Sequence, residues 1–179
     1  MTDWIRFSCP HLEESYCECR HPVGLRILVS PKDFSATYAI VGIGYGSRDR
    51  FAGGALPMGC AHFLEHKMFE MEDGVDAFDY FAQTGADANA FTSSLCTCYL
   101  FSCTECFDES LEILLDMVNT PHFTEESVER EKGIIAQEIK MGEDNPTNRV
   151  LYGMLEGLYE KNSVRIDIAG TVPSIMEIT

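Results

Sequence analysis

The stretch AHFLEHKM (residues 61–68) decides how this chain folds, because it predicts a helix that carries two different faces. A helix turns by about 100° per residue, so His62 and His66 project within about 40° of each other. Glu65 lies about 60° to the other side of His62. This spacing favours a zinc site with a base beside it. The alternative is that the two histidines and the glutamate are solvated surface residues.

The opposite face of this predicted helix is apolar. Ala61, Leu64 and Met68 cluster on the helical wheel and are expected to dock the helix on a hydrophobic core. The imidazoles and the carboxylate are therefore segregated on one side, as a metal site requires.

The charge of the chain excludes some classes of partner. The 179 residues include 29 acidic and 13 basic side chains, which give a net charge of −16. So acidic a surface argues against binding to nucleic acid or to an anionic membrane. No export signal or apolar run long enough to span a bilayer is recognisable, so we expect a cytoplasmic protein.

The chain has eight cysteines, which we expect to be reduced in that compartment. Their spacing leaves a second metal hypothesis open, since Cys103-x-x-Cys106 and the Cys-x-Cys pairs at 17–19 and 96–98 could assemble a thiolate zinc site. A cysteine-zinc interaction module of this kind would leave both histidines without a role.

Further elements are predicted from apolar periodicity and from turn and cap residues. We expect strands at 25–29, 37–45 and 88–102, and a loop through Gly53 and Gly54 before the histidine helix. Helices are expected at 73–83, from a cap at Asp108, from a cap at Thr124 to about residue 141, at 147–159, and from a cap at Thr171.

The helix predicted after Thr124 offers a third metal ligand. Glu131 and Glu138 share its apolar face and lie about 10 Å apart along the axis. A buried carboxylate needs a compensating charge, and a metal ion would supply it. The alternative is that one of them pairs with Arg130, Lys132 or another basic residue.

Several motifs together resemble a known family. The segments 59–69, 85–92 and 128–139 are similar, in this order, to the N-terminal part of insulinase and pitrilysin-type zinc peptidases, the inverzincins with His-x-x-Glu-His. The segment 164–171 is similar to their bacterial YmfH-like branch. The resemblance implies an α+β fold with a mostly antiparallel sheet and helices packed on one side.

Carried over position by position, the resemblance implies that His62, His66 and Glu138 bind Zn²⁺. Glu65 is then the general base that activates a zinc-bound water. Glu131 matches an acidic position whose side chain contacts the metal ligands and not the metal itself. The function implied is a zinc metalloendopeptidase that hydrolyses peptide bonds in extended or unstructured peptides.

The resemblance also implies how a substrate binds. Asn89, Ala90 and Phe91 match an edge strand on which relatives lay an extended peptide. The alternative function is that of a noncatalytic homologue that acts as a binding or assembly subunit. Such homologues usually lose a metal ligand or the base, whereas this chain retains His62, Glu65, His66 and Glu138.

The resemblance finally bears on domain organisation. Residues 1–179 match one zinc-bearing N-terminal peptidase domain, cut short at its C-terminal end. Relatives pair this half with a homologous C-terminal half or a partner subunit, so we expect the isolated chain to be inactive without one. The open edge strand leads us to expect that the isolated chain forms homo-oligomers.

Overall fold

The computed structural model describes residues 3–49 and 56–179. The predicted loop through Gly53 and Gly54 lies outside these residues. By its internal contacts the chain divides into two compact units, Met1–Ser35 and Ala36–Thr179. Across the described ranges, no helix combines the length and apolarity that a membrane crossing needs.

The first unit is a three-stranded antiparallel sheet in the order β1-β2-β3. Its strands are β1 (Ile5–Cys9), β2 (Glu14–Arg20) and β3 (Arg26–Val29), and a 3₁₀ turn, η1 (Pro10–Leu12), joins the first two. The sequence predicted only the third strand. The residues of β1 do alternate, with Ile5, Phe7 and Cys9 on one face and Arg6 and Ser8 on the other, but this short pattern did not lead to a predicted strand, and all five residues are exposed.

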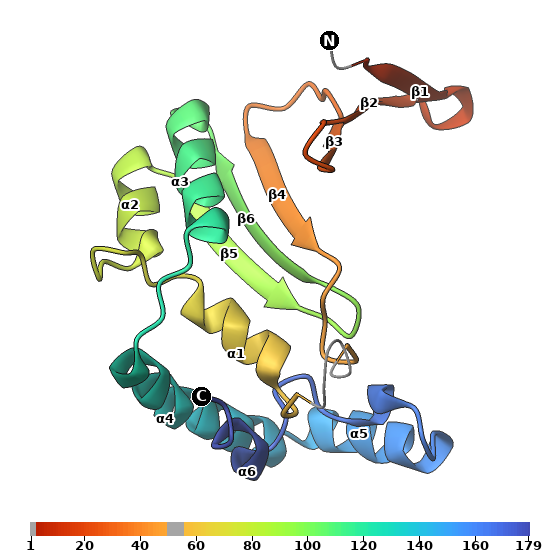
Figure 1. Cartoon of the computed structure of the whole chain (residues 1–179). Coiled ribbons are helices and arrows are strands. Elements are labelled where there is room, and N and C mark those ends of the chain that lie inside the picture. The colour runs from red at the N-terminus through yellow and green to blue at the C-terminus, as the bar shows by residue number, and fades with distance from the viewer. Residues whose placement is uncertain (1–2, 50–55) are drawn as a thin grey trace. The chain divides into compact units, whose positions relative to one another are not determined.

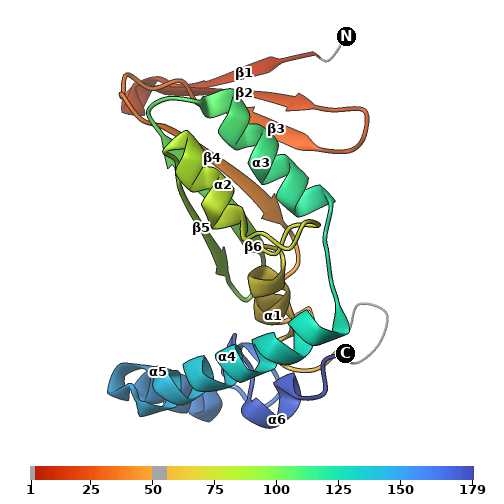
Figure 2. The ribbon, with the colours of Figure 1, turned by 90° about the vertical axis from the view of Figure 1, so that its left-hand side faces the viewer.

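The second unit contains another antiparallel sheet, in the order β4-β6-β5. Its strands are β4 (Thr37–Ile43), β5 (Asp87–Thr92) and β6 (Thr97–Cys103). Helices α2 (Ala77–Thr84) and α3 (Phe107–Asn119) pack on one face of this sheet, as Figures 1 and 2 show. Phe81, Phe101 and Leu114 are almost fully buried between the two layers. The predicted α+β class, with helices on one side, is confirmed.

The remaining helices form a second layer beside one end of this sheet. They are α1 (Cys60–Lys67), α4 (Glu125–Asp144), α5 (Pro146–Leu158), the 3₁₀ turn η2 (Ser163–Arg165) and the short α6 (Val172–Ile175). In both views α1 lies between the sheet and α4 (Figures 1 and 2). A second core of Phe63, Ile135, Ile139 and Ile175 joins α1, α4 and α6.

The predicted single strand over residues 88–102 is wrong. The structure has two strands, β5 and β6, joined by a tight turn at residues 93–96. The Ser93 hydroxyl stabilises this turn by accepting hydrogen bonds from the backbone N–H groups of Leu95 and Cys96, both at 3.1 Å. The sequence has no glycine or proline here, so the usual turn signal is missing.

Two predicted helix starts also differ from the structure. The second helix begins at Ala77, because the Asp76 side chain caps it by accepting from Phe78 N–H at 2.9 Å. The third begins at Phe107, so Asp108 lies inside its first turn and does not cap it. The predicted caps at Thr124 and Thr171 are confirmed, and each forms a capping box with a serine three residues later.

Candidate metal centre

Helix α1 presents His62, Glu65 and His66 on one side, and both neighbouring layers of the structure hold it in place. Met68, just after the helix, and Leu64 pack against the sheet core, as the apolar face predicted. The two imidazole rings lie one turn apart, with centroids separated by 4.6 Å. Tertiary packing on two sides therefore fixes the direction in which the imidazoles point.

The start of α1 is held by a close backbone approach. Gly59 caps the helix with φ 86°, and a Cβ atom built there would lie 2.3 Å from the carbonyl oxygen of Ala169. At Gly170, φ 76°, a Cβ would lie 2.5 Å from the carbonyl oxygen of Met58. The Ser174 hydroxyl donates to that same Met58 oxygen at 2.8 Å. Only glycine fits at these two positions, because each backbone occupies the space that a side chain would need.

Helix α4 brings a carboxylate to the Nε2 atoms of both histidines. Glu138 Oε1 lies 3.5 Å from His62 Nε2, and Glu138 Oε2 lies 3.4 Å from His66 Nε2. Among the described residues these three side chains form the one group that could hold a metal ion, with ligand atoms all within 4.8 Å of one another. Two ligands bound about 2.0–2.1 Å from a tetrahedral zinc ion are about 3.3–3.5 Å apart. The donor set and its spacing therefore fit zinc.

The other predicted glutamate on α4 contacts an imidazole from behind. His66 Nδ1 donates to Glu131 Oε1 at 3.0 Å, and this hydrogen bond raises the pKa of His66. A carboxylate at this place fixes the tautomer that leaves Nε2 free to bind a metal. The alternative pairing of this glutamate with a lysine or arginine does not occur in the described structure, since its one ion-pair partner there is His66.

His62 has a different environment. Burial lowers its pKa, and the neighbouring His66 lowers it further. The nearby carboxylates of Glu138, Glu65 and Asp167 act in the opposite direction. Nδ1 of His62 is buried and has no hydrogen-bond partner among the described residues. The net effect keeps this imidazole neutral, the form in which histidine binds a metal.

Glu65 is largely buried, and the neighbouring edge strand holds its side chain. Thr92, the last residue of β5, donates a hydrogen bond from its hydroxyl to Glu65 Oε2. The Thr97 hydroxyl lies 3.5 Å from that of Thr92 and donates to the Tyr45 carbonyl oxygen at 2.9 Å. Sequence reasoning assigned no role to Thr92, because a contact 27 residues away in the chain has no local signal.

These groups share a cavity of about 370 Å³. His62, Glu65, His66 and Glu138 line it, together with Ala90, Phe91 and Thr92 of β5 and residues 167–169 of the segment after η2. The structure thus brings Ala90 and Phe91 to the histidines. Asn89 is not in this lining, and its side-chain oxygen accepts from Ala90 N–H at 2.8 Å. Along the outer edge of β5, no described strand pairs with it.

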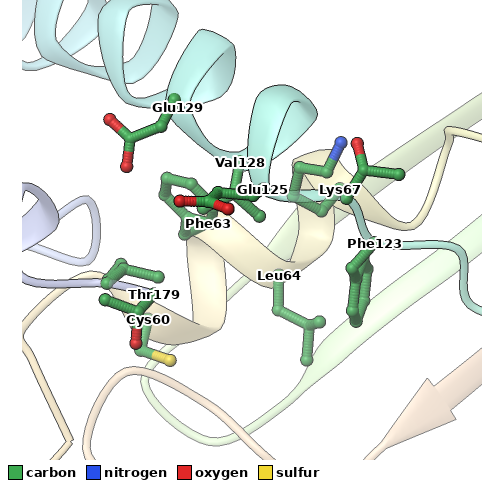
Figure 3. A pocket seen from close by; sticks show the side chains of 11 residues that line it. Cys60, Phe63, Leu64, Lys67, Phe123, Glu125, Val128, Glu129 and Thr179 are labelled. Carbon is green, nitrogen blue, oxygen red and sulfur yellow. The ribbon is translucent and has the colours of Figure 1, made fainter.

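A larger hollow of about 530 Å³ lies on another side of α1, against the start of α4. Phe63, Leu64 and Phe123 form much of its wall (Figure 3). Lys67 also lines it, but pairs with Glu70 at 2.5 Å. This hollow includes neither histidine, so we place the chemistry in the smaller cavity.

The cysteines do not form the alternative metal site in the part of the chain that the structure describes. All eight are free, and the one three-ligand group found there contains no cysteine. Cys98 approaches Cys96, with sulfur atoms 3.9 Å apart, while burial raises the pKa of the Cys98 thiol to about 11. The raised pKa disfavours the thiolate, which is the form in which cysteine binds a metal.

Comparison with known sequences identifies the family. The profile of the family described as Insulinase (Peptidase family M16) matches residues 29–172. The uncharacterized zinc protease YmfH of Bacillus subtilis is 49% identical over 176 residues, covering 94% of this chain and 41% of that protein. An uncharacterized zinc protease of Mycobacterium leprae is 32% identical, covering 91% of this chain and 37% of that protein.

Solved structures agree with these sequence matches. The crystal structure of an M16-like peptidase from Alicyclobacillus acidocaldarius superposes with a TM-score of 0.88 at 42% identity, over 97% of this chain and 41% of that one. Pitrilysin superposes with a TM-score of 0.76 at 17% identity, which shows a shared fold. The chain belongs to the insulinase family of peptidases. Within that family it is similar to bacterial proteins named zinc proteases, and it spans about two fifths of the length of those named here.

Proposed function

We propose that this chain is the zinc-binding part of a metalloendopeptidase that hydrolyses peptide bonds in extended or unstructured peptides. The observation that carries the proposal is the convergence of His62 Nε2 and His66 Nε2 on the two oxygens of Glu138, at 3.5 and 3.4 Å. His62, His66 and Glu138 would hold the metal, and Glu131 would orient His66. A zinc ion bound there would lower the pKa of a water molecule and polarise the peptide carbonyl.

Glu65 is the proposed general base and acid. Its Oε2 accepts from Thr92, which fixes the carboxylate at the wall of the cavity beside both histidines. From there it takes the proton of the attacking water and passes it to the departing amine.

Strand β5 is the proposed substrate platform. Its outer edge has no partner strand among the described residues, and Ala90 and Phe91 line the cavity. An extended peptide added to this edge would form main-chain hydrogen bonds with β5 and pass beside Glu65. This mode of binding requires an unfolded segment, which is why we assign unstructured peptides as substrates.

The chain spans 41% of the length of YmfH from Bacillus subtilis. We therefore propose that catalysis also needs a homologous second half or a partner subunit, which would complete the enclosure of the substrate. The cavity around the histidines is open to solvent, since the side chain of Glu138 in its lining is 48% exposed. This openness supports the need for a further part that covers the substrate.

Metal analysis of the purified chain tests the site. We expect about one zinc per chain, lost in His62→Ala and kept in Glu65→Gln, since Glu65 is not a ligand. Zinc that survives His62→Ala but is lost on changing Cys103 or Cys106 would refute the proposed site.

Cleavage of an unstructured peptide tests the reaction. In the complete gene product that carries this sequence, with any partner subunit present, Glu65→Gln should abolish turnover while keeping zinc. Unchanged turnover would remove Glu65 as the base. A zinc-loaded wild-type protein that binds peptides but cleaves none would favour the noncatalytic alternative, a binding or assembly subunit.

A further inference from the structure

The segment after η2 brings an additional carboxylate to the metal cavity. Asp167 lines this cavity together with Ile168 and Ala169. It lies far from His62 and Glu65 in the sequence, so no local sequence pattern predicts that these residues are neighbours. Its carboxylate is close enough to act on the pKa of His62. Asp167 is thus part of the wall that a bound peptide would meet beside Glu65.

All lysine and arginine ion pairs of the described structure involve carboxylates other than Asp167. No lysine or arginine lines the metal cavity, although Arg149 and Arg165 line a neighbouring cavity that Asp167 also borders. Four carboxylates surround the site: those of Glu65, Glu131, Glu138 and Asp167. The lining of the cavity itself therefore contains carboxylates and no lysine or arginine.

The position of Asp167 is well determined by its neighbours. Its Oδ1 accepts from Ala169 N–H at 2.9 Å. The Tyr152 hydroxyl accepts from Ile168 N–H at 3.4 Å and lies beside the same turn. Burial raises the pKa of Tyr152, and the Asp167 carboxylate raises it further, which places the two groups close together. A carboxylate that is half-buried and held in this way interacts strongly with a fixed charge brought next to it.

We propose that Asp167 determines specificity, by favouring substrates with a lysine or arginine side chain next to the scissile bond. This inference rests on the proposed peptidase function. A cationic side chain entering the cavity would find an unpaired carboxylate, whereas an acidic one would be repelled. The alkyl part of a lysine or arginine would at the same time contact the apolar side chains of Phe91 and Ile168.

The test compares Asp167→Asn with a matched control. Asparagine keeps the oxygen that accepts from Ala169 N–H and removes only the charge, so the turn is retained. Asp144→Asn makes the same chemical change at an exposed position at the end of α4, outside the cavity. Both variants should keep zinc, and loss of zinc in Asp167→Asn alone would overturn the specificity role in favour of a metal-supporting one.

The substrates are two series of peptides that differ at one residue, lysine in one and norleucine in the other, placed in turn at the four positions around the scissile bond. In the complete gene product we expect kcat/KM to favour lysine by about tenfold at one position. Asp167→Asn should reduce this ratio to about one, and Asp144→Asn should leave it unchanged. Cleavage with a ratio that Asp167→Asn does not change overturns this inference and leaves the peptidase function standing.

Binding separates the inference from the reaction. Fluorescence anisotropy measures, without turnover, how tightly zinc-loaded Glu65→Gln protein binds a labelled lysine peptide and its norleucine counterpart from these series, with and without the Asp167→Asn change. Tighter binding of the lysine peptide that depends on Asp167 supports the inference even if the wild-type protein cleaves neither peptide, a result that contradicts the peptidase function. Equal binding of both peptides, or binding of neither, overturns the inference.

Discussion

The two helices that carry the candidate metal centre differ in what makes them helical. Helix α4 has twenty residues and begins with a capping box, in which Thr124 and Ser127 exchange hydrogen bonds, and with Glu125 and Glu126 in its first turn. Helix α1 has eight residues, no side-chain cap, and a glycine in the left-handed conformation before its first residue. An isolated helix as short as α1 is not stable in water.

The difference shows that the glutamates on α4 and the histidines on α1 are positioned by different interactions. Local interactions at the cap fix the start of α4 and therefore the helical positions of Glu131 and Glu138. Ile135 and Ile139 then dock this side of the helix on the core that contains Phe63 and Ile175. Contacts from distant parts of the chain place His62 and His66, since residues 169–174 hold the start of α1. Substitutions at the start of α1 should therefore be more damaging than substitutions at the start of α4.

The largest effect is expected at Gly59. Gly59→Ala would place a methyl group 2.3 Å from the Ala169 oxygen, at a φ of 86° that alanine rarely adopts. We expect the free energy of unfolding to fall by about 3 kcal/mol or more, with loss of zinc binding, measured by urea denaturation and metal analysis. Gly85→Ala is the matched control, because φ is 73° there but nothing lies within 4 Å, and it should cost about 1 kcal/mol. Equal losses in the two variants would contradict the role of the close approach.

An intermediate effect is expected at Glu131. Glu131→Gln removes the carboxylate that orients His66 and raises its pKa, but it leaves the three proposed ligands in place. Zinc affinity should fall about 10- to 100-fold, measured by competition with a coloured chelator. Glu126→Gln, an exposed change on the same helix, should leave the affinity unaltered. An affinity that stays unchanged in Glu131→Gln would remove Glu131 from the site.

The smallest effect is expected at the start of α4. Thr124→Ala removes the hydroxyl that accepts from Ser127 N–H at 3.1 Å, and should lower the free energy of unfolding by about 1 kcal/mol. Thr104→Ala, an exposed threonine outside the helices, serves as the control. Zinc affinity should stay within about twofold in both variants, because Ile135 and Ile139 still hold α4 in place. A loss of zinc as large as in Gly59→Ala would mean that α4 depends on its cap as strongly as α1 depends on residues 169–174.

The same contrast explains which elements could be predicted. The caps at Thr124 and Thr171 were predictable because their hydrogen bonds join residues three apart. The turn between β5 and β6 was missed because a serine side chain stabilises it without glycine or proline. Strands β1 and β2 were missed because they pair with each other across a turn, a contact that neither short segment signals by itself.

By itself the sequence determined the types of the candidate metal-binding and acid-base groups, their spacing on two helices, and the family to which the chain belongs. These features depend on helical periodicity and on short motifs, which act over a few residues. Only the tertiary structure decided that Thr92 holds Glu65, that Gly59 and Gly170 must be glycines, and that Asp167 faces the same cavity. Those contacts join residues from 27 to more than 100 positions apart, so their geometry depends on how the layers pack.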